Sequence, residues 1–237
     1  MAATITKADH HVDSTWKPLY RIGGIALLVE GLAYLIITVT SAIIRVAPGN
    51  TMKYLHALGM HSGTANFTYT VVAIADFVLI PAALALYFAL KDVSKSWMLL
   101  AAVIILTYVA IDISTFVSAA FALTVLAHET QSPTIVSAEH FGLATVSLSQ
   151  FIGWVFPTLG YLIIAVVIRV GHFGRLTFWL GILTVITNIP AGIAFLHPST
   201  SLQKYQSLGL VALGLFSLAL GIMLLRLDRK PSSSSLA

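Results

Sequence analysis

Long apolar stretches alternate with shorter polar ones along almost the whole chain. Each apolar stretch is continuous, and each is near or above the roughly 20 residues that a helix needs to cross a bilayer. Strands of a membrane barrel would instead alternate apolar and polar residues over about ten positions. The pattern therefore predicts an all-α, polytopic membrane protein built as a bundle of six transmembrane helices. The expected spans are 22–44, 67–90, 98–127, 149–168, 176–196 and 206–225.

The polar stretches divide the chain around this bundle. A segment 1–21 precedes a transmembrane domain over 22–226, and a serine-rich, flexible tail, 227–237, follows it. The connections 45–66 and 128–148 are the longest, and each has room for a short interfacial helix. The third expected span exceeds one bilayer thickness, so we expect it to tilt or to project beyond the membrane.

The basic residues are distributed unevenly between the two ends of the expected bundle. Ten Lys and Arg residues fall on the side of the N-terminus and three on the other side. Cytoplasmic loops carry such an excess, so the N- and C-termini are both expected in the cytoplasm. The ten are Lys7, Lys17, Arg21, Lys91, Lys95, Arg169, Arg175, Arg226, Arg229 and Lys230, and the three are Arg45, Lys53 and Lys204.

Composition agrees with this topology and excludes several classes of protein. The 237 residues are 58% hydrophobic and 9% charged, whereas a soluble domain is about 25% charged. Soluble, disordered and nucleic-acid-binding proteins are therefore excluded, despite the net charge of +4. The absence of cysteine removes disulfides, thiolate metal sites and cysteine nucleophiles. The lipid bilayer is the partner that the composition requires.

Three acidic residues, Glu30, Asp76 and Asp112, lie inside the expected spans, and no Lys or Arg lies in a span core to pair with them. Ionisable groups are expensive there and are candidates for function. The helical rise places Asp76 and Asp112 level with each other, roughly 20 Å from the inner face, with Asn188 at about the same depth. Glu30 is expected nearer the cytoplasm.

Each acid belongs to a stripe of small or polar residues at helical spacing, so we expect all three to face other helices. Two interpretations stay open. In one, each carboxyl is a protonated or hydrogen-bonded packing residue, satisfied by a Tyr, Thr or Asn. In the other, Asp76, Asp112 and Asn188 surround a midplane cavity for a proton, cation or polar ligand, and the two aspartates resemble a pair that shares a proton. On the last span, Gly214, Ser217 and Gly221 form a small-residue face that predicts helix packing or self-association instead of a ligand site.

Histidines gather on the outer side of the expected topology. Imidazole and carboxylate together suit Zn, Cu or Fe, and Glu129 and Glu139 lie nearby in the sequence. No pair has the spacing of H-E-x-x-H, however, so interfacial histidines in loops are favoured over a metal site. The candidate metal ligands are His56, His61, His128, His140 and His197.

Three motifs resemble an uncharacterised prokaryotic family of six-span integral membrane proteins, a domain of unknown function. They are Arg21-Ile-Gly-Gly-Ile-Ala-Leu-Leu, Ala85-Leu-Tyr-Phe-Ala-Leu-Lys-Asp-Val-Ser-Lys and Phe173-Gly-Arg-Leu-Thr-Phe-Trp-Leu-Gly-Ile-Leu. The resemblance implies six helices in a prokaryotic plasma membrane. It brings no activity, cofactor or catalytic residue.

Three functions are compatible with the sequence, which contains no phosphate-binding loop, dinucleotide fingerprint or nucleophile elbow. The first and favoured one is a non-enzymatic accessory or structural subunit that packs with other membrane subunits or with itself. The second is a small proton-linked transporter that uses the intramembrane carboxylates. The third is a metal-dependent membrane enzyme that uses the outer histidines. The sequence indicates no particular cofactor.

Overall fold

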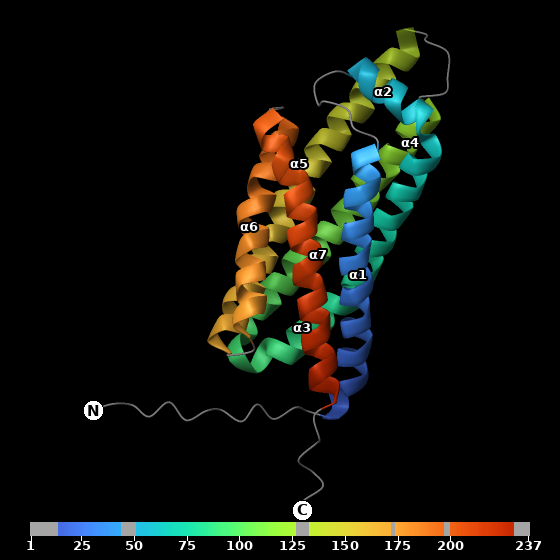
Figure 1. Ribbon diagram of the computed structural model, residues 1–237. Coiled ribbons are helices and arrows are strands. Elements are labelled where there is room, and N and C mark those ends of the chain that lie inside the picture. The colour runs from blue at the N-terminus through green and yellow to red at the C-terminus, as the bar shows by residue number, and fades with distance from the viewer. Residues whose placement is uncertain (1–13, 44–50, 127–132, 172–173, 197–199, 230–237) are drawn as a thin grey trace, which may run out of the picture.

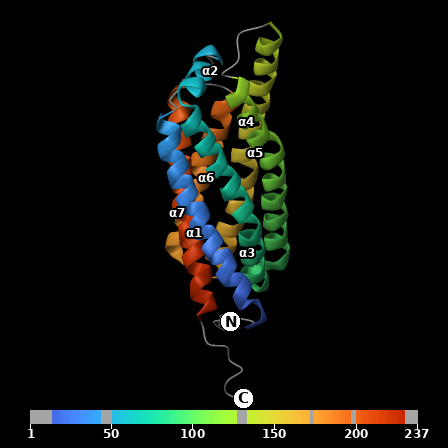
Figure 2. The same ribbon diagram turned by 90° about the vertical axis from the view of Figure 1, so that its right-hand side faces the viewer.

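The computed structural model describes residues 14–43, 51–126, 133–171, 174–196 and 200–229, and over these residues the chain is helical, without a strand. The helices lie side by side in an elongated bundle (Figures 1 and 2). They are α1 (Lys17–Ile43), α2 (Thr51–Met60), α3 (Ser62–Ile111), α4 (Ser118–Leu126), α5 (Pro133–Val170), α6 (Arg175–Leu196) and α7 (Thr200–Asp228). A 3-10 turn, Ser14–Trp16, precedes α1, and a π-helical turn, Asp112–Val117, joins α3 to α4. The expected all-α fold class is confirmed.

Five helical segments of the described chain are long and apolar enough to cross a membrane. The second, Ser62–Ala122, has 61 residues. At 1.5 Å per residue a straight helix of this length would extend about 90 Å, three times the hydrocarbon thickness of a bilayer. This segment contains the second and most of the third expected span, which is why the described chain has five apolar segments where the sequence predicts six.

The 61-residue segment folds back on itself at Ser94, whose backbone dihedrals (φ −161°, ψ 93°) leave the helical region. The Tyr108 hydroxyl donates a hydrogen bond to the Asp76 carboxyl at 3.0 Å, although 32 residues separate the two. A straight helix would hold them about 48 Å apart. Residues 62–93 and 95–111 are therefore antiparallel, as Figure 1 shows, and we call them the first and second arms of α3.

The helices and arms close a ring around one interior. α1 packs against α7 and α3, α5 packs against α3 and α6, and α6 packs against α7. Gly23 of α1 meets Ala85 of the first arm, whereas Gly160 of α5 meets Ile105 of the second arm. The order around the ring is therefore α1, first arm, second arm, α5, α6 and α7, which gives every one of these helices an interior face.

α1 and α7 approach each other most closely through glycines. A Cβ atom at Gly31 would lie 2.8 Å from the Gly214 carbonyl oxygen, and one at Gly221 would lie 2.8 Å from the Gly24 carbonyl oxygen. Small residues allow helix backbones in membranes to pack this closely. The small-residue face that the sequence identifies on the last span is thus a packing face, and its partner is α1 of the same chain.

Large apolar side chains cover the outside of the bundle. On α1, the exposed residues Ile22, Ile25, Val29, Leu32 and Ile36 recur every three or four positions and form one stripe. The buried face of the same helix carries glycine, alanine and a carboxyl group. An apolar exterior around a partly polar interior suits a lipid environment, so the structure fits a membrane-embedded protein.

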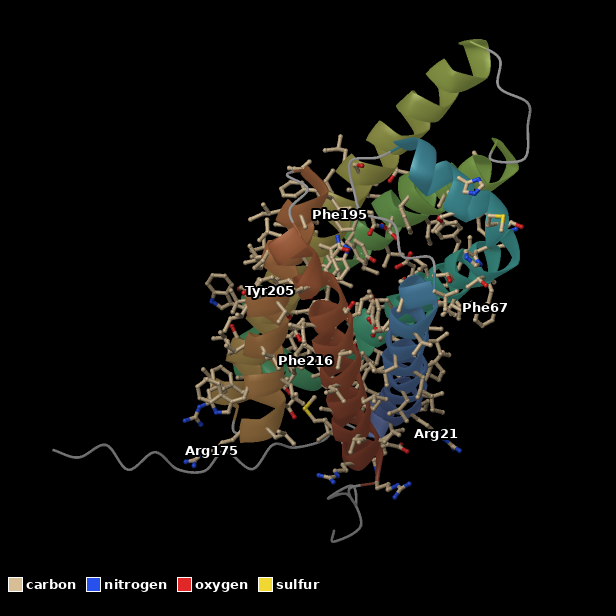
Figure 3. The ribbon with its side chains drawn as sticks, turned by 45° about the horizontal axis from the view of Figure 1, so that its top comes forward. Arg21, Phe67, Arg175, Phe195, Tyr205 and Phe216 are labelled. Carbon is tan, nitrogen blue, oxygen red and sulfur yellow. The ribbon has the colours of Figure 1, made fainter. Side chains whose placement is uncertain are left out.

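Basic side chains gather at one end of the bundle. The start of α1, the Ser94 turn, the end of α5, the start of α6 and the end of α7 all lie at this end (Figure 1). Figure 3 shows Arg21 and Arg175 there, directed away from the helices. The basic residues on these segments are Lys17, Arg21, Lys91, Lys95, Arg169, Arg175, Arg226 and Arg229.

The opposite end carries two further helical pieces. α2 lies in the first long connection, where the sequence has room for a short helix. The second long connection differs from expectation, because residues 133–148 form no separate helix but extend α5 to 38 residues. Pro133 is the first residue of α5, a position where the fixed φ angle of proline suits a helix start.

Candidate functional site: a buried acid–tyrosine cluster

The three intramembrane acids are almost completely buried inside the ring. Glu30 is 0% exposed, Asp76 1% and Asp112 3%. Glu30 comes from α1, Asp76 from the first arm of α3, and Asp112 from the start of the π-helical turn. None of the three carboxyl groups faces the lipid side, as their stripes of small and polar residues predict.

Two of the acids accept hydrogen bonds from tyrosines of neighbouring helices. The Tyr108 hydroxyl donates to Asp76 Oδ1 at 3.0 Å, and the Tyr161 hydroxyl donates to Glu30 Oε1 at 3.1 Å. The Tyr161 ring also packs edge-on against Phe216 of α7, with 6.0 Å between ring centroids. Phe216 is fully buried and is labelled on α7 in Figure 3. The Phe216 contact helps to hold the Tyr161 hydroxyl in position toward Glu30.

Asp112 lies beside Asp76, and the two carboxyls interact directly. Asp112 is the first residue of the π-helical turn, a local widening of the helix that is frequent at functional sites. On its other side it meets Gly153 of α5, where a Cβ atom would lie 3.0 Å from Asp112 Oδ1. A larger residue at Gly153 would press on the carboxyl, so glycine lets α5 pack closely against Asp112 at this point.

Tyr34 of α1 joins the two halves of the site. Its hydroxyl lies next to the Glu30 carboxyl and next to the Tyr108 hydroxyl. The groups therefore follow one another in the order Tyr161, Glu30, Tyr34, Tyr108, Asp76 and Asp112. We call these six residues the acid–tyrosine cluster.

Several oxygens at the cluster are buried without a hydrogen-bond partner. They are Glu30 Oε2, Asp76 Oδ2 and Ser217 Oγ. The Ser217 hydroxyl of α7 lies beside Glu30, and Asp112 lies beside Asp76. An unsatisfied buried polar atom costs about 1–3 kcal/mol. A proton on Glu30 Oε2 would let that oxygen donate to Ser217, and a proton between the two aspartates would turn their contact into a hydrogen bond.

No Lys, Arg or His side chain contributes to the surroundings of these carboxyls among the residues that the structure describes. Two adjacent carboxyls in a low dielectric cannot both carry a charge cheaply. Carboxyl and phenol groups can each hold and release a proton, and a Tyr hydroxyl both donates and accepts hydrogen bonds. The cluster can therefore bind protons and pass them between neighbouring groups.

Asn188 does not join the two aspartates, although the sequence places it at their depth. It is 2% exposed, and its Oδ1 atom lies against Gly209 of α7 beside the Trp154 ring of α5. Helical rise gives the depth of a residue but not the direction in which its helix faces around the ring. On α6, this position is directed to α5 and α7, away from the acids.

Sequence reasoning missed one member of the cluster, Tyr161, and the role of its neighbour Ser217. Tyr161 was not recognised at all, although it lies next to Gly160, which with Gly153 forms a small-residue seam at heptad spacing on α5. Ser217 was assigned to a packing face, and that face does pack, but its hydroxyl also reaches the Glu30 region. In both cases the signal was a polar side chain next to, or at helical spacing from, small residues.

The structure describes few of the candidate metal ligands. His56 and His61 are exposed. His128 and His197 lie outside the described residues, as does the side chain of His140. Within the described part of the chain, no three His, Asp or Glu residues group closely enough to hold a metal ion.

No family model, curated protein or solved structure matches this chain. The function is therefore argued from the geometry of the site itself.

Proposed function

We propose that the chain crosses the membrane six times, with both termini in the cytoplasm of a prokaryotic cell, in its plasma membrane. The fold-back at Ser94 supports the count, because each side of the turn has enough apolar helix for one crossing. The eight basic residues at the end shared by the start of α1 and the end of α7 support the orientation.

Within this topology, the function that the site supports best is that of a small proton-linked transporter. One observation carries the proposal: three buried carboxyls from separate helical segments lie in one cluster with three tyrosines, two of which connect Glu30 to the aspartates, with no cationic partner among the described residues. Ionisable groups at membrane depth are expensive. Asn, Gln or Thr would satisfy a packing role without a titrating group, so packing alone leaves three acids in one cluster unexplained.

The cluster would work as a relay. Asp76 and Asp112 hold a proton between them at one end, and Glu30 holds a proton at the other. Tyr108 and Tyr34 lie between these two sites, and each hydroxyl can accept a proton on a lone pair while it releases its own. A proton can therefore pass from the aspartate pair to Glu30 without a charged side chain having to move.

The same geometry weakens one ground for the accessory-subunit function. The sequence favoured that function partly because of small-residue helix faces that could bind a partner. The one that the sequence assigns to packing or self-association, on α7, is already occupied by α1. No observation of the described histidines favours the metal-dependent enzyme.

Infrared spectroscopy of the protein in lipid nanodiscs tests the proposal. A working proton site must exchange with water, so the carbonyl stretch of the protonated carboxyls should shift on transfer to D2O and should change with pH. Asp76→Asn, Asp112→Asn and Glu30→Gln should each remove part of this signal. Asp92→Asn is the matched control, because Asp92 is an exposed acid at the basic end of the bundle.

Two results would contradict the proposal. The first is a carboxyl signal that neither shifts in D2O nor titrates in the folded protein, which would show that the cluster is closed to protons. The second is a loss of signal in Asp92→Asn equal to that in the three cluster variants. Either result would favour the packing subunit instead.

A further inference from the structure

A second polar group lies between α5, α6 and α7, away from the acid–tyrosine cluster. Asn188 Oδ1 and Gln206 Nε2 are both buried and neither has a hydrogen-bond partner. One is an acceptor and the other a donor. The two atoms do not pair with each other, and a buried polar atom left unsatisfied costs about 1–3 kcal/mol unless another group pairs with it.

The two residues lie on helix faces that meet near Gly209. Asn188 Oδ1 lies against Gly209, and Gln206 precedes Gly209 by three residues, about one helical turn, on α7. Residues at this spacing lie on one helix face. A side chain at Gly209 would enter the space of Asn188 and of Trp154, because a Cβ atom there would lie 2.5 Å from Asn188 Oδ1 and 2.7 Å from Trp154 Cζ3.

Aromatic rings form the wall of this region. The Trp154 ring lies 6.3 Å from the ring of Phe195, which is labelled near the end of α6 in Figure 3. The indole N–H of Trp154 already donates to Gln150 Oε1 at 3.0 Å, which fixes the ring and leaves its face as an apolar surface. The region thus combines an apolar wall with one free acceptor and one free donor.

We propose that Asn188, Gln206 and Trp154 form a binding site for a small, uncharged solute that carries a hydroxyl or amide group. Such a group accepts a hydrogen bond from Gln206 Nε2 and donates one to Asn188 Oδ1, while its carbon atoms lie against Trp154. Neither side chain carries a charge, so an ion would lose its hydration without gaining a counter-charge. A carboxylate has the shape of an amide but no N–H group, so it could not donate the hydrogen bond that Asn188 Oδ1 requires.

This site is independent of the acid–tyrosine cluster in its contacts, although α5 touches both. Gly153 faces Asp112, and the next residue, Trp154, faces Gly209. If the protein is a proton-linked transporter, the second site would hold the solute that moves with the proton. Binding to the second site can nevertheless be measured when the acids are removed, so the two proposals can fail separately.

Fluorescence of Trp154 provides the test. The other three tryptophans, Trp16, Trp97 and Trp179, lie on segments near the basic end and are changed to Phe. The remaining emission of the full-length protein in nanodiscs is titrated with acetamide and, separately, with acetate. Acetamide should change the emission along a saturating curve, and acetate should not.

Substitutions at the two polar residues make the test specific. Asn188→Leu and Gln206→Leu should each weaken the acetamide response at least about tenfold, which corresponds to the loss of one good hydrogen bond. Gln206 is only half-buried, so its variant remains informative if Asn188→Leu does not fold. Ser207→Ala, at an exposed neighbouring position, is the control and should leave the curve unchanged. Asp76→Asn should still give a saturating acetamide curve, which shows that the site can be measured without the aspartate pair.

A response that is linear with concentration, equal for acetamide and acetate, or unaffected by Gln206→Leu would overturn the proposal. In that case a buried water molecule, and no solute site, would satisfy the two atoms.

Discussion

Removal of one hydroxyl from the acid–tyrosine cluster tests how much its hydrogen bonds contribute to the stability of the protein. In Tyr108→Phe the ring stays, but the 3.0 Å hydrogen bond to Asp76 Oδ1 is lost. Asp76 Oδ2 already has no hydrogen-bond partner in the native protein. The variant therefore leaves neither carboxyl oxygen with a tyrosine hydroxyl as its donor. The change therefore removes a bond and adds an unsatisfied acceptor at a position that is 1% exposed.

Two magnitudes bound the expected loss of stability. Hydrogen bonds between membrane helices contribute on average about 0.6 kcal/mol, with a maximum of about 1.7. A buried acceptor left unsatisfied costs about 1–3 kcal/mol. Because Asp76 is buried and can turn to few other donors, we expect Tyr108→Phe to lower the free energy of unfolding by about 1–2 kcal/mol.

Reversible unfolding of the purified protein in mixed detergent micelles measures this loss. Tyr205→Phe is the control, because Tyr205 is 36% exposed on α7 and the same hydroxyl is removed there. A double-mutant cycle with Asp76→Asn isolates the pair, and its coupling energy should be about 0.5–1.5 kcal/mol. The reasoning is refuted if Tyr108→Phe is as stable as Tyr205→Phe, or if the two cluster substitutions are additive.

Three other predictions concern helix packing and the membrane topology. Gly31→Ala should destabilise the protein by about 1–3 kcal/mol in the same unfolding assay, because its Cβ would lie 2.8 Å from the Gly214 carbonyl oxygen; Gly63→Ala, which meets nothing within 4 Å, should be nearly neutral. Gly209→Ala should displace Asn188 and shift the emission of Trp154, and an unchanged spectrum would contradict the close approach of these three residues. Cysteines introduced at Gly63 and Ser96 of this cysteine-free chain should react with an impermeant reagent from opposite sides of the membrane; labelling of both from one side would exclude the proposed topology.

Much of the architecture was readable from the pattern of apolar residues. Continuous apolar runs specify helices, because in a bilayer only a helix satisfies all backbone hydrogen bonds within one segment. The stripes around Glu30, Asp76 and Asp112 were enough to predict that the three acids face inward, and all three are buried. The turn at Ser94 was predicted in place, since basic and polar residues interrupt the apolar sequence there.

The identity of the partners was decided only by the tertiary structure. The helical period gives each residue an angle on its own helix, and the helical rise gives its depth in the membrane. Neither tells which helix lies opposite. The ring order brings Tyr161 of α5 to Glu30 of α1 across 131 positions in the chain, and brings α7 to α1 through their glycines. It also turns Asn188 toward Gly209 and away from the aspartates at its depth. Local sequence specifies the polar faces, whereas helix packing specifies which polar groups meet, because a hydrogen bond acts over about 3 Å and depends on how neighbouring helices are rotated.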